Sequence, residues 1–173
     1  HLSIRRQRQM CIRDRVLQET CWSGRQWLDQ GLPPICLAVN ISNNQFRRHN
    51  INELIAKILE TSLFPAEYLR LEMTEVDLMD NQKNTLDILT SLHNQGVRLA
   101  IDHFGTGYSS LRCLKDFPIE QLKIDKSFVD ETTITPGSHT IITTIIATAH
   151  ILGVKVLADG VETAEQLAFL RQQ

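Results

Sequence analysis

The segment Leu99-Ala-Ile-Asp-His-Phe-Gly-Thr-Gly-Tyr-Ser-Ser110 is the stretch that decides the fold. In it, a short apolar run leads directly to Asp102, His103 and a glycine-rich turn. Other apolar runs of the chain also stop at polar or charged residues, and these stops are Asn40, Glu72, Lys123 with Asp125, and Asp159. Because a (β/α) barrel builds its site from side chains at the C-terminal ends of its strands, this arrangement predicts a barrel-type α/β fold.

Helix-like and strand-like stretches alternate along the chain. Apolar residues at helical spacing predict helices over 16–30, 51–63, 85–93, 140–152 and 163–170. Short apolar runs predict strands over 35–41, 68–73, 97–101, 121–124 and 154–157, the first of them buried on both faces. A further short helix is expected to begin at Ser109 or Ser110 and to reach Leu114.

This order is one helix followed by five β/α units, which makes a partial TIM-like barrel. A full barrel has eight strands and typically ~250 residues, whereas this chain has 173. Five parallel strands cannot close such a barrel, so we expect a chain that is truncated at both ends and inactive when taken alone. A doubly wound open sheet is the alternative fold, but it gathers its site at one switch point rather than at nearly every strand end.

Composition narrows the functional class. The formal net charge is −2, and no apolar run approaches the ~20 residues of a membrane span. We therefore expect neither a nucleic-acid polymer nor a membrane as a partner of this segment. The cysteines have neither paired nor metal-type spacing, and they are Cys11, Cys21, Cys36 and Cys113. We interpret them as reduced thiols, which predicts a cytoplasmic location.

Residues 1–15 differ from the rest of the chain because arginines crowd them and apolar periodicity is weak. A basic arm for an anionic partner is one interpretation. A targeting peptide is another, although the segment lacks the apolar central region that such peptides have. Residues 8–15 also resemble translated sequencing-adapter text, and we favour this interpretation. Residues 1–15 are thus expected to be a non-native leader, and residues 16–173 a partial catalytic domain.

Five ordered blocks of the chain resemble the EAL-domain family. The blocks are Val39-Asn-Ile-Ser42 with Gln45-Phe46, Leu71-Glu-Met-Thr-Glu75, the segment from Ile101 to Leu111, Leu122-Lys-Ile-Asp125 with Phe128-Val129, and Ala158-Asp-Gly-Val-Glu-Thr163 with Gln166. The resemblance covers residues 16–173. It implies a TIM-like barrel that uses Mg²⁺ or Mn²⁺ to hydrolyse one phosphodiester bond of the bacterial second messenger cyclic di-GMP, giving linear pGpG.

Hard oxygen ligands suit Mg²⁺ or Mn²⁺, and Asn40, Glu72 and Asp102 offer them at strand ends. Two such ions could clamp a phosphodiester and lower the pKa of an attacking water. The resemblance implies that these three residues bind metal, with Asp102 bridging two ions, and it adds His103 and Asp159 to the metal site. Without the resemblance, Asn40 is equally well a turn residue. For Glu72 the alternative is a solvated charge at a strand edge, which its apolar neighbours disfavour.

Lys123 is expected on the face opposite to its apolar neighbours, because side chains alternate along a strand. The resemblance implies that it orients or deprotonates the attacking water and that Asp159 and Glu162 are catalytic, whereas a surface lysine is the alternative. It further implies that Glu75 supports the glycine-rich loop and that this loop contributes to a homodimer. The supported loop residues are Gly105, Thr106 and Gly107.

Three departures from the family pattern keep a second hypothesis open. His103 stands where the family has a second aspartate, and Asp159 is one methylene shorter than the family's glutamate. The Glu-Ala-Leu segment with its metal-binding glutamate is absent, since its position falls before residue 16. Imidazole suits Mg²⁺ poorly, and a shift of ~1 Å at a reacting group costs about 10²-fold in rate. The sequence therefore predicts a phosphodiesterase, with a degenerate EAL domain that only binds cyclic di-GMP or a protein partner as the alternative.

Overall fold

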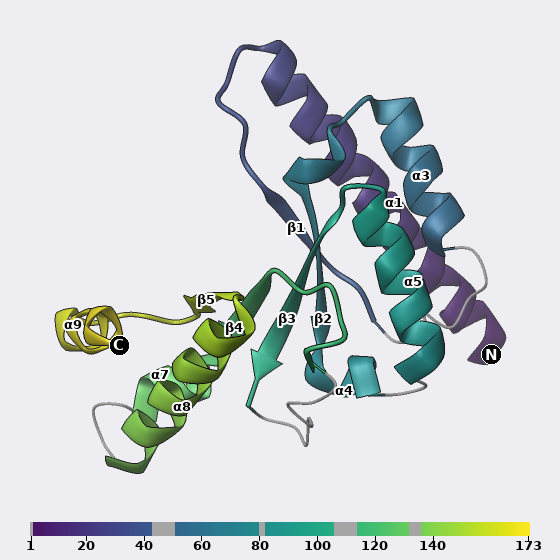
Figure 1. The fold of residues 1–173 in the computed structure, drawn as a ribbon. Helices are drawn as coiled ribbons and strands as arrows, with labels where there is room; N and C mark the ends of the chain where they lie inside the picture. Colours follow the sequence, from purple (N-terminus) through teal and green to yellow (C-terminus); the bar gives the residue numbers. More distant parts are fainter. Residues whose placement is uncertain (1, 43–50, 80–81, 106–113, 132–135) are drawn as a thin grey trace.

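The computed structural model describes residues 2–42, 51–79, 82–105, 114–131 and 136–173 (Figure 1). Within these residues a single five-stranded sheet has the order β1-β2-β3-β4-β5, and every neighbouring pair is parallel. The strands are β1 (Leu37–Asn40), β2 (Leu69–Thr74), β3 (Arg98–Phe104), β4 (Gln121–Ile124) and β5 (Lys155–Ala158).

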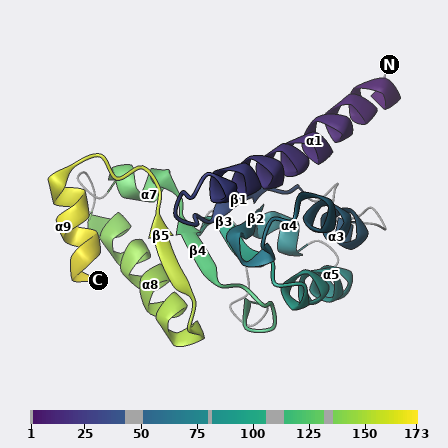
Figure 2. The same cartoon turned by 90° about the horizontal axis from the view of Figure 1, so that it is seen from above.

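Helices follow the strands in turn, as the sequence predicts. They are α1 (Leu2–Asp29), α3 (Ile51–Ser62), the 3₁₀ turn η1 (Ala66–Tyr68), α4 (Glu75–Met79), α5 (Gln82–Asn94), α7 (Lys126–Glu131), α8 (Pro136–Leu152) and α9 (Ala164–Gln172). Helix α1 packs against β1 and α3, α5 packs against β3 and α3, and α8 packs against β4 and β5. Figure 2 shows α8 and α9 at the β5 end of the row of strands and α3 and α5 at the opposite end.

The strand order confirms the barrel-type α/β fold. Each strand pairs with the strand that precedes it in the chain, so the winding never reverses. A doubly wound sheet needs such a reversal, because its strand order turns back at the switch point. The described part of the chain is therefore a succession of five β/α units of a TIM-like barrel.

Alternation along the strands separates the core from the polar site. Leu71, Leu99 and Leu122 are at most 1% exposed and belong to the apolar core. Glu72 and Lys123 each lie next to one of these leucines in sequence, so their side chains leave the opposite face of the sheet. The expected face of Lys123 is confirmed.

The edge strands differ from the expectation. The strand predicted over 35–41 is shorter, and it is not buried on both faces, because Ala38 and Asn40 are exposed. Strands β1 and β5 each pair on one side only in the described sheet, and both contain exposed residues. Core burial on both faces is therefore confined to the central strands.

Three helical features were not predicted. Helix α1 begins at Leu2 rather than at Val16, and its first fourteen residues contain neither glycine nor proline to stop it. The short helices α4 and α7 carry too few residues to show an apolar period. The helix expected between Ser109 and Leu114 falls almost wholly on residues outside the described ranges. No helix in the described residues is long and apolar enough to cross a membrane.

Candidate active site

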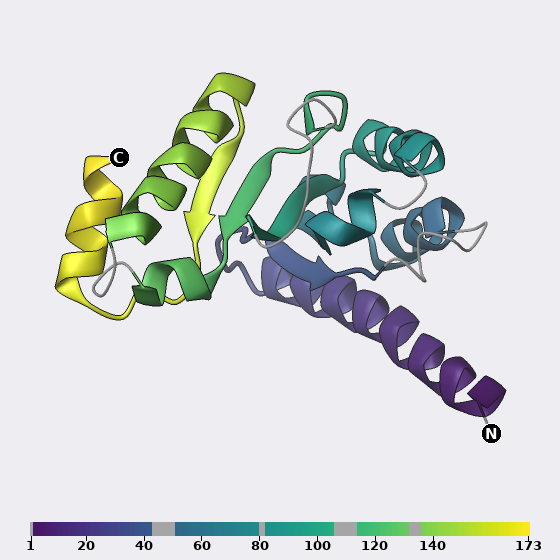
Figure 3. The ribbon, with the colours of Figure 1, turned by 90° about the horizontal axis from the view of Figure 1, so that it is seen from below.

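Three carboxylates from three strands meet at the ammonium group of Lys123. The Nζ atom lies 2.9 Å from Oε2 of Glu72 on β2, 3.2 Å from Oδ1 of Asp102 on β3 and 3.1 Å from Oδ2 of Asp159, which follows β5. Parallel strands place their C-terminal ends at one edge of the sheet, which explains why residues up to 87 positions apart meet here. Figure 3 views the molecule from the side on which α4 lies in Figure 1.

The lysine is held as a cation. Burial acts to lower the pKa of Lys123, but its hydrogen bonds to Glu72, Asp159 and Asp102 raise the pKa above its ordinary value. The side chain of Lys123 is only 14% exposed, and that of Glu72 only 8%. One ammonium faces three carboxylates, so this edge of the sheet carries an excess of negative charge. Such an excess is suited to binding further cations.

His103 lies at the rim of this cluster in an unusual backbone conformation. Its φ is +54°, and the register between β3 and β4 shifts at this point, as at a β-bulge. The His103 backbone N–H donates to Oδ1 of Asp102 at 3.0 Å. The imidazole Nδ1 contacts Oδ2 of Asp125, and Nε2 lies 3.4 Å from Oδ2 of Asp102. The bulge therefore aims the imidazole between two carboxylates.

The His103–Asp125 pair has consequences for both pKa values. The hydrogen bond with Asp125 raises the pKa of His103 above 6.5. The same bond, together with the Ser127 backbone N–H that donates to Oδ1 at 2.8 Å, lowers the pKa of Asp125 to about 2. Between the lowered pKa of Asp125 and the raised pKa of His103, the two side chains carry opposite charges and form an ion pair.

In the metal-free protein this pair is expected to make stability pH-dependent. Its contribution is fully present below pH 6.5, the ordinary pKa of histidine, and is lost as the pH rises through the raised pKa. On the acid side it is lost as the pH falls from 3.8 through about 2. Because the His103 side chain is 55% exposed, solvent screening limits the effect to at most about 1 kcal/mol.

The measurement is the free energy of unfolding of the parent chain and of His103→Ala in EDTA. His103→Ala should cost more at about pH 5.5 than at about pH 9. An equal cost at both pH values would contradict the ion pair.

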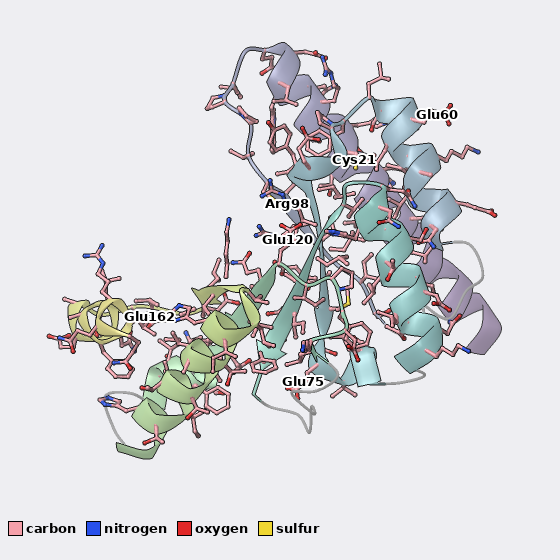
Figure 4. All side chains as sticks on the ribbon, viewed as in Figure 1. Cys21, Glu60, Glu75, Arg98, Glu120 and Glu162 are labelled. Carbon is pink, nitrogen blue, oxygen red and sulfur yellow. The ribbon has the colours of Figure 1, made fainter. Side chains whose placement is uncertain are left out.

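Glu75 contacts the first glycine of the predicted loop. It opens α4 directly after β2, is 3% exposed, and accepts a hydrogen bond at Oε2 from the backbone N–H of Gly105 at 3.1 Å. Gly105 has a φ of +96°, which favours glycine. Figure 4 shows Glu75 at the lower end of the sheet, beside α4. Thr106 and Gly107 lie outside the described residues.

Glu162, predicted as catalytic, makes a different contact. Its Oε1 lies 2.6 Å from Nζ of Lys126 at the start of α7, and both side chains are more than half exposed. Figure 4 shows Glu162 next to α9, the helix that follows it. Asp159, three residues earlier in the same loop, is the acid that reaches Lys123.

The side-chain oxygens at this edge can be compared with the ligands that Mg²⁺ or Mn²⁺ prefers, since the sequence predicts such a metal. Asn40 pairs in register with Glu72, so their side chains leave the same face of the sheet as the Lys123 cluster. Amide and carboxylate oxygens are the ligands that Mg²⁺ and Mn²⁺ prefer, and Glu72 and Asp102 are buried with an excess of negative charge. The chemistry fits such an ion. Among the described residues, no group of three or more His, Cys, Asp or Glu is already arranged to hold one.

Two residues of the site escaped the sequence prediction. Asp125 ends an apolar run, which is the same signal that singles out Asp102, but the sequence assigns it no role. Lys126 begins a helix too short to be predicted, and no local pattern connects it to the loop after β5.

Comparison with known proteins shows the family of the chain. The EAL domain family matches residues 10–173. The signaling protein YkoW of Bacillus subtilis (strain 168) is 43% identical over 155 residues, which are 90% of this chain and 19% of YkoW. The chain thus spans about a fifth of that relative.

Solved structures give the same result. The structure of the PaMucR phosphodiesterase in complex with c-di-GMP has a TM-score of 0.93 and 36% identity, and the match covers 99% of this chain and 69% of that one. The manganese/cy-diGMP complex of Klebsiella pneumoniae BlrP1 has a TM-score of 0.77 and 25% identity over 90% of this chain and 40% of BlrP1.

A parallel five-unit α/β sheet with a lysine and three carboxylates at its C-terminal edge defines a barrel-type domain with a polar edge at the ends of its strands. The chain belongs to the EAL domain family.

Proposed function

We propose that the protein containing this chain hydrolyses one phosphodiester bond of cyclic di-GMP, giving linear pGpG. The observation that carries the proposal is the convergence of Glu72, Asp102 and Asp159 on Lys123 at the strand ends. The likeness to the PaMucR phosphodiesterase in its c-di-GMP complex supports the same substrate.

Asn40, Glu72 and Asp102 would hold Mg²⁺ or Mn²⁺ in a two-metal site, with His103 and Asp159 contributing ligands. When bound, the ions supply positive charge to the phosphodiester and lower the pKa of water. The manganese/cy-diGMP complex of BlrP1 supports a divalent metal in a domain of this fold. Glu72 and Asp102 are buried and both contact Lys123, so these ligands would lie close together.

Lys123 and Asp159 would have different roles toward the attacking water. Because its hydrogen bonds raise the pKa of Lys123, it acts as a donor that orients the water and stabilises negative charge on the phosphoryl oxygens. Asp159 accepts from Lys123 and has a side chain 41% exposed, so substrate water can reach it. Its carboxylate is the candidate acceptor of the proton.

A second function, binding without turnover, is favoured by one observation. His103 contacts Asp102 and Asp125, so an imidazole occupies the place between the two acids. If that arrangement blocks a second metal, the domain is a cyclic di-GMP receptor. Turnover of the full-length protein with Mg²⁺, Mn²⁺ or EDTA, measured beside calorimetric binding of cyclic di-GMP, separates the two functions. Metal-dependent product supports the enzyme, and tight binding with no product supports the receptor.

His103 also predicts a metal preference. Mn²⁺ should support turnover better than Mg²⁺, because Mg²⁺ prefers oxygen to imidazole nitrogen. Replacing the histidine by the family's residue, His103→Asp, should raise Mg²⁺-supported turnover. The check is steady-state hydrolysis by both proteins with each metal. An active parent that prefers Mg²⁺ and gains nothing from His103→Asp would remove His103 from the metal site.

Three further expectations stay proposals. We infer a cytoplasmic location from the cysteine pattern, a homodimer through the loop that Glu75 anchors at Gly105, and a non-native origin for residues 1–15. The location follows from the thiol chemistry, and the homodimer follows from the family resemblance. The third concerns residues that the match to the family includes only from residue 10 onward.

A further inference from the structure

We propose that Lys126 is a positioning residue whose side chain straps the loop 159–163 and so holds Asp159 against Lys123. The proposal rests on the proposed function only in that Asp159 acts on the substrate. The strap itself consists of Lys126, Gly160 and Glu162, all outside the cluster around Lys123.

The strap begins where the stem of Lys126 crosses the loop backbone at Gly160. A Cβ atom added to Gly160 would lie 2.5 Å from Cγ of Lys126, 2.7 Å from Cδ and 3.0 Å from Cβ. Gly160 also has a φ of +75°. A glycine at this position is what allows the lysine stem to lie this close to the chain.

The strap ends in an ion pair between Lys126 and Glu162, which lies beside the pair between Lys123 and Asp159 in both segments of the chain. Nζ of Lys126 donates to Oε1 of Glu162 at 2.6 Å, and Nζ of Lys123 lies 3.1 Å from Oδ2 of Asp159. Lys126 follows Lys123 by three residues, and Glu162 follows Asp159 by three. The β4–α7 connection and the loop after β5 are therefore joined twice.

Hydrogen bonds attach the rest of the loop to the same elements. The Asp159 N–H donates to the carbonyl of Ile124 at 3.1 Å. The Gln166 side chain accepts from the N–H groups of Glu162 at 2.7 Å and Thr163 at 2.9 Å, and its Nε2 donates to the carbonyl of Val129 on α7 at 3.2 Å. These bonds hold both ends of the loop, and Lys126 lies against the segment between them at Gly160.

The strap affects the position of Asp159 more than it affects the stability of the fold. An exposed ion pair contributes little to folding, and the side chains of Lys126 and Glu162 are 53% and 65% exposed. A misplacement of ~1 Å at a reacting group costs about 10²-fold in rate. Loss of the strap should therefore lower kcat much more than it lowers stability.

The first test compares Lys126→Met with Lys57→Met, an exposed lysine of α3, in the full-length protein. Lys126→Met should lower kcat at least about 10-fold with KM within about 2-fold, while Lys57→Met changes neither. Lys126→Arg should restore kcat to within about 3-fold, because it keeps the stem and the charge. Equal kcat values for Lys126→Met and Lys57→Met would overturn the proposal.

A second test uses two glycines with the same backbone conformation. Gly160 and Gly153 have φ values of +75° and +71°. A Cβ at Gly160 would meet Lys126, whereas no atom of the described residues lies within 4 Å of a Cβ at Gly153. Gly160→Ala should lower kcat and Gly153→Ala should not, although both strain the backbone. The double variant Gly160→Ala/Lys126→Met should be no slower than Lys126→Met alone. Equal kcat values for the two alanine variants would contradict the strap.

Amide hydrogen exchange decides the proposal even if the protein does not turn over. Lys126→Met should speed exchange across residues 159–163 and leave α3 unchanged, because only the loop loses an anchor. Absence of product from the parent protein would defeat the proposed function alone. Unchanged exchange over 159–163 would defeat the strap alone.

Discussion

Replacement of Asp102 by asparagine is expected to lower hydrolysis of cyclic di-GMP by at least about 10²-fold, the scale of one lost charge-stabilising group. The amide has nearly the shape of the carboxylate and still accepts at Oδ1 from the His103 backbone N–H, so the fold should survive. What is lost is a buried negative charge that faces Lys123 and, in the proposed function, would help to hold the metal.

The measurement is steady-state turnover of full-length Asp102→Asn with Mg²⁺ and Mn²⁺. Asp87→Asn, which changes an exposed acid of α5, is the matched control and should keep the parental rate. An Asp102→Asn protein that unfolds like the parent and turns over at a similar rate would show that Asp102 is not part of the active site.

Replacement of Lys123 by methionine should have the largest effect on stability. It leaves Glu72, Asp102 and Asp159 facing one another with no cation between them. Removing one partner of a buried ion pair costs about 3–5 kcal/mol. In EDTA, the free energy of unfolding should fall by about this amount, and added Mn²⁺ should restore part of it, because a bound cation stabilises the folded state.

Two variants control this experiment. Lys155→Met removes an exposed lysine from the neighbouring strand β5 and should have little effect. Lys123→Arg keeps the charge and should be much more stable than Lys123→Met. If Lys123→Met were as stable as Lys155→Met in EDTA, the buried cluster would not depend on its ammonium group.

The fold was predictable because its signals are local. Apolar runs that stop at Glu72, Asp102 and Asp159 mark parallel strands and the polar groups at their ends without any knowledge of the tertiary structure. The period of two along β4 also predicts the face of Lys123. These signals lie within a few residues of one another, where the sequence and the conformation are directly related.

The rest of the site depends on contacts between distant segments. A histidine with a φ of +54° is rare, so nothing in the sequence predicts that a bulge aims His103 at Asp125. The strap joins Lys126 to Gly160 and Glu162 across 36 positions at its ion pair. Only the paired ends of β4 and β5 bring these residues together, and that pairing is a tertiary property.

Product analysis in ¹⁸O-labelled water tests hydrolysis at the Lys123 site. The full-length protein is incubated with cyclic di-GMP and Mn²⁺, and the nucleotides are examined by mass spectrometry. We expect linear pGpG carrying one ¹⁸O atom in its terminal phosphate, because water attacks one phosphorus and one P–O bond breaks. Recovery of intact, unlabelled cyclic di-GMP from a protein that binds it tightly would contradict hydrolysis at the Lys123 site.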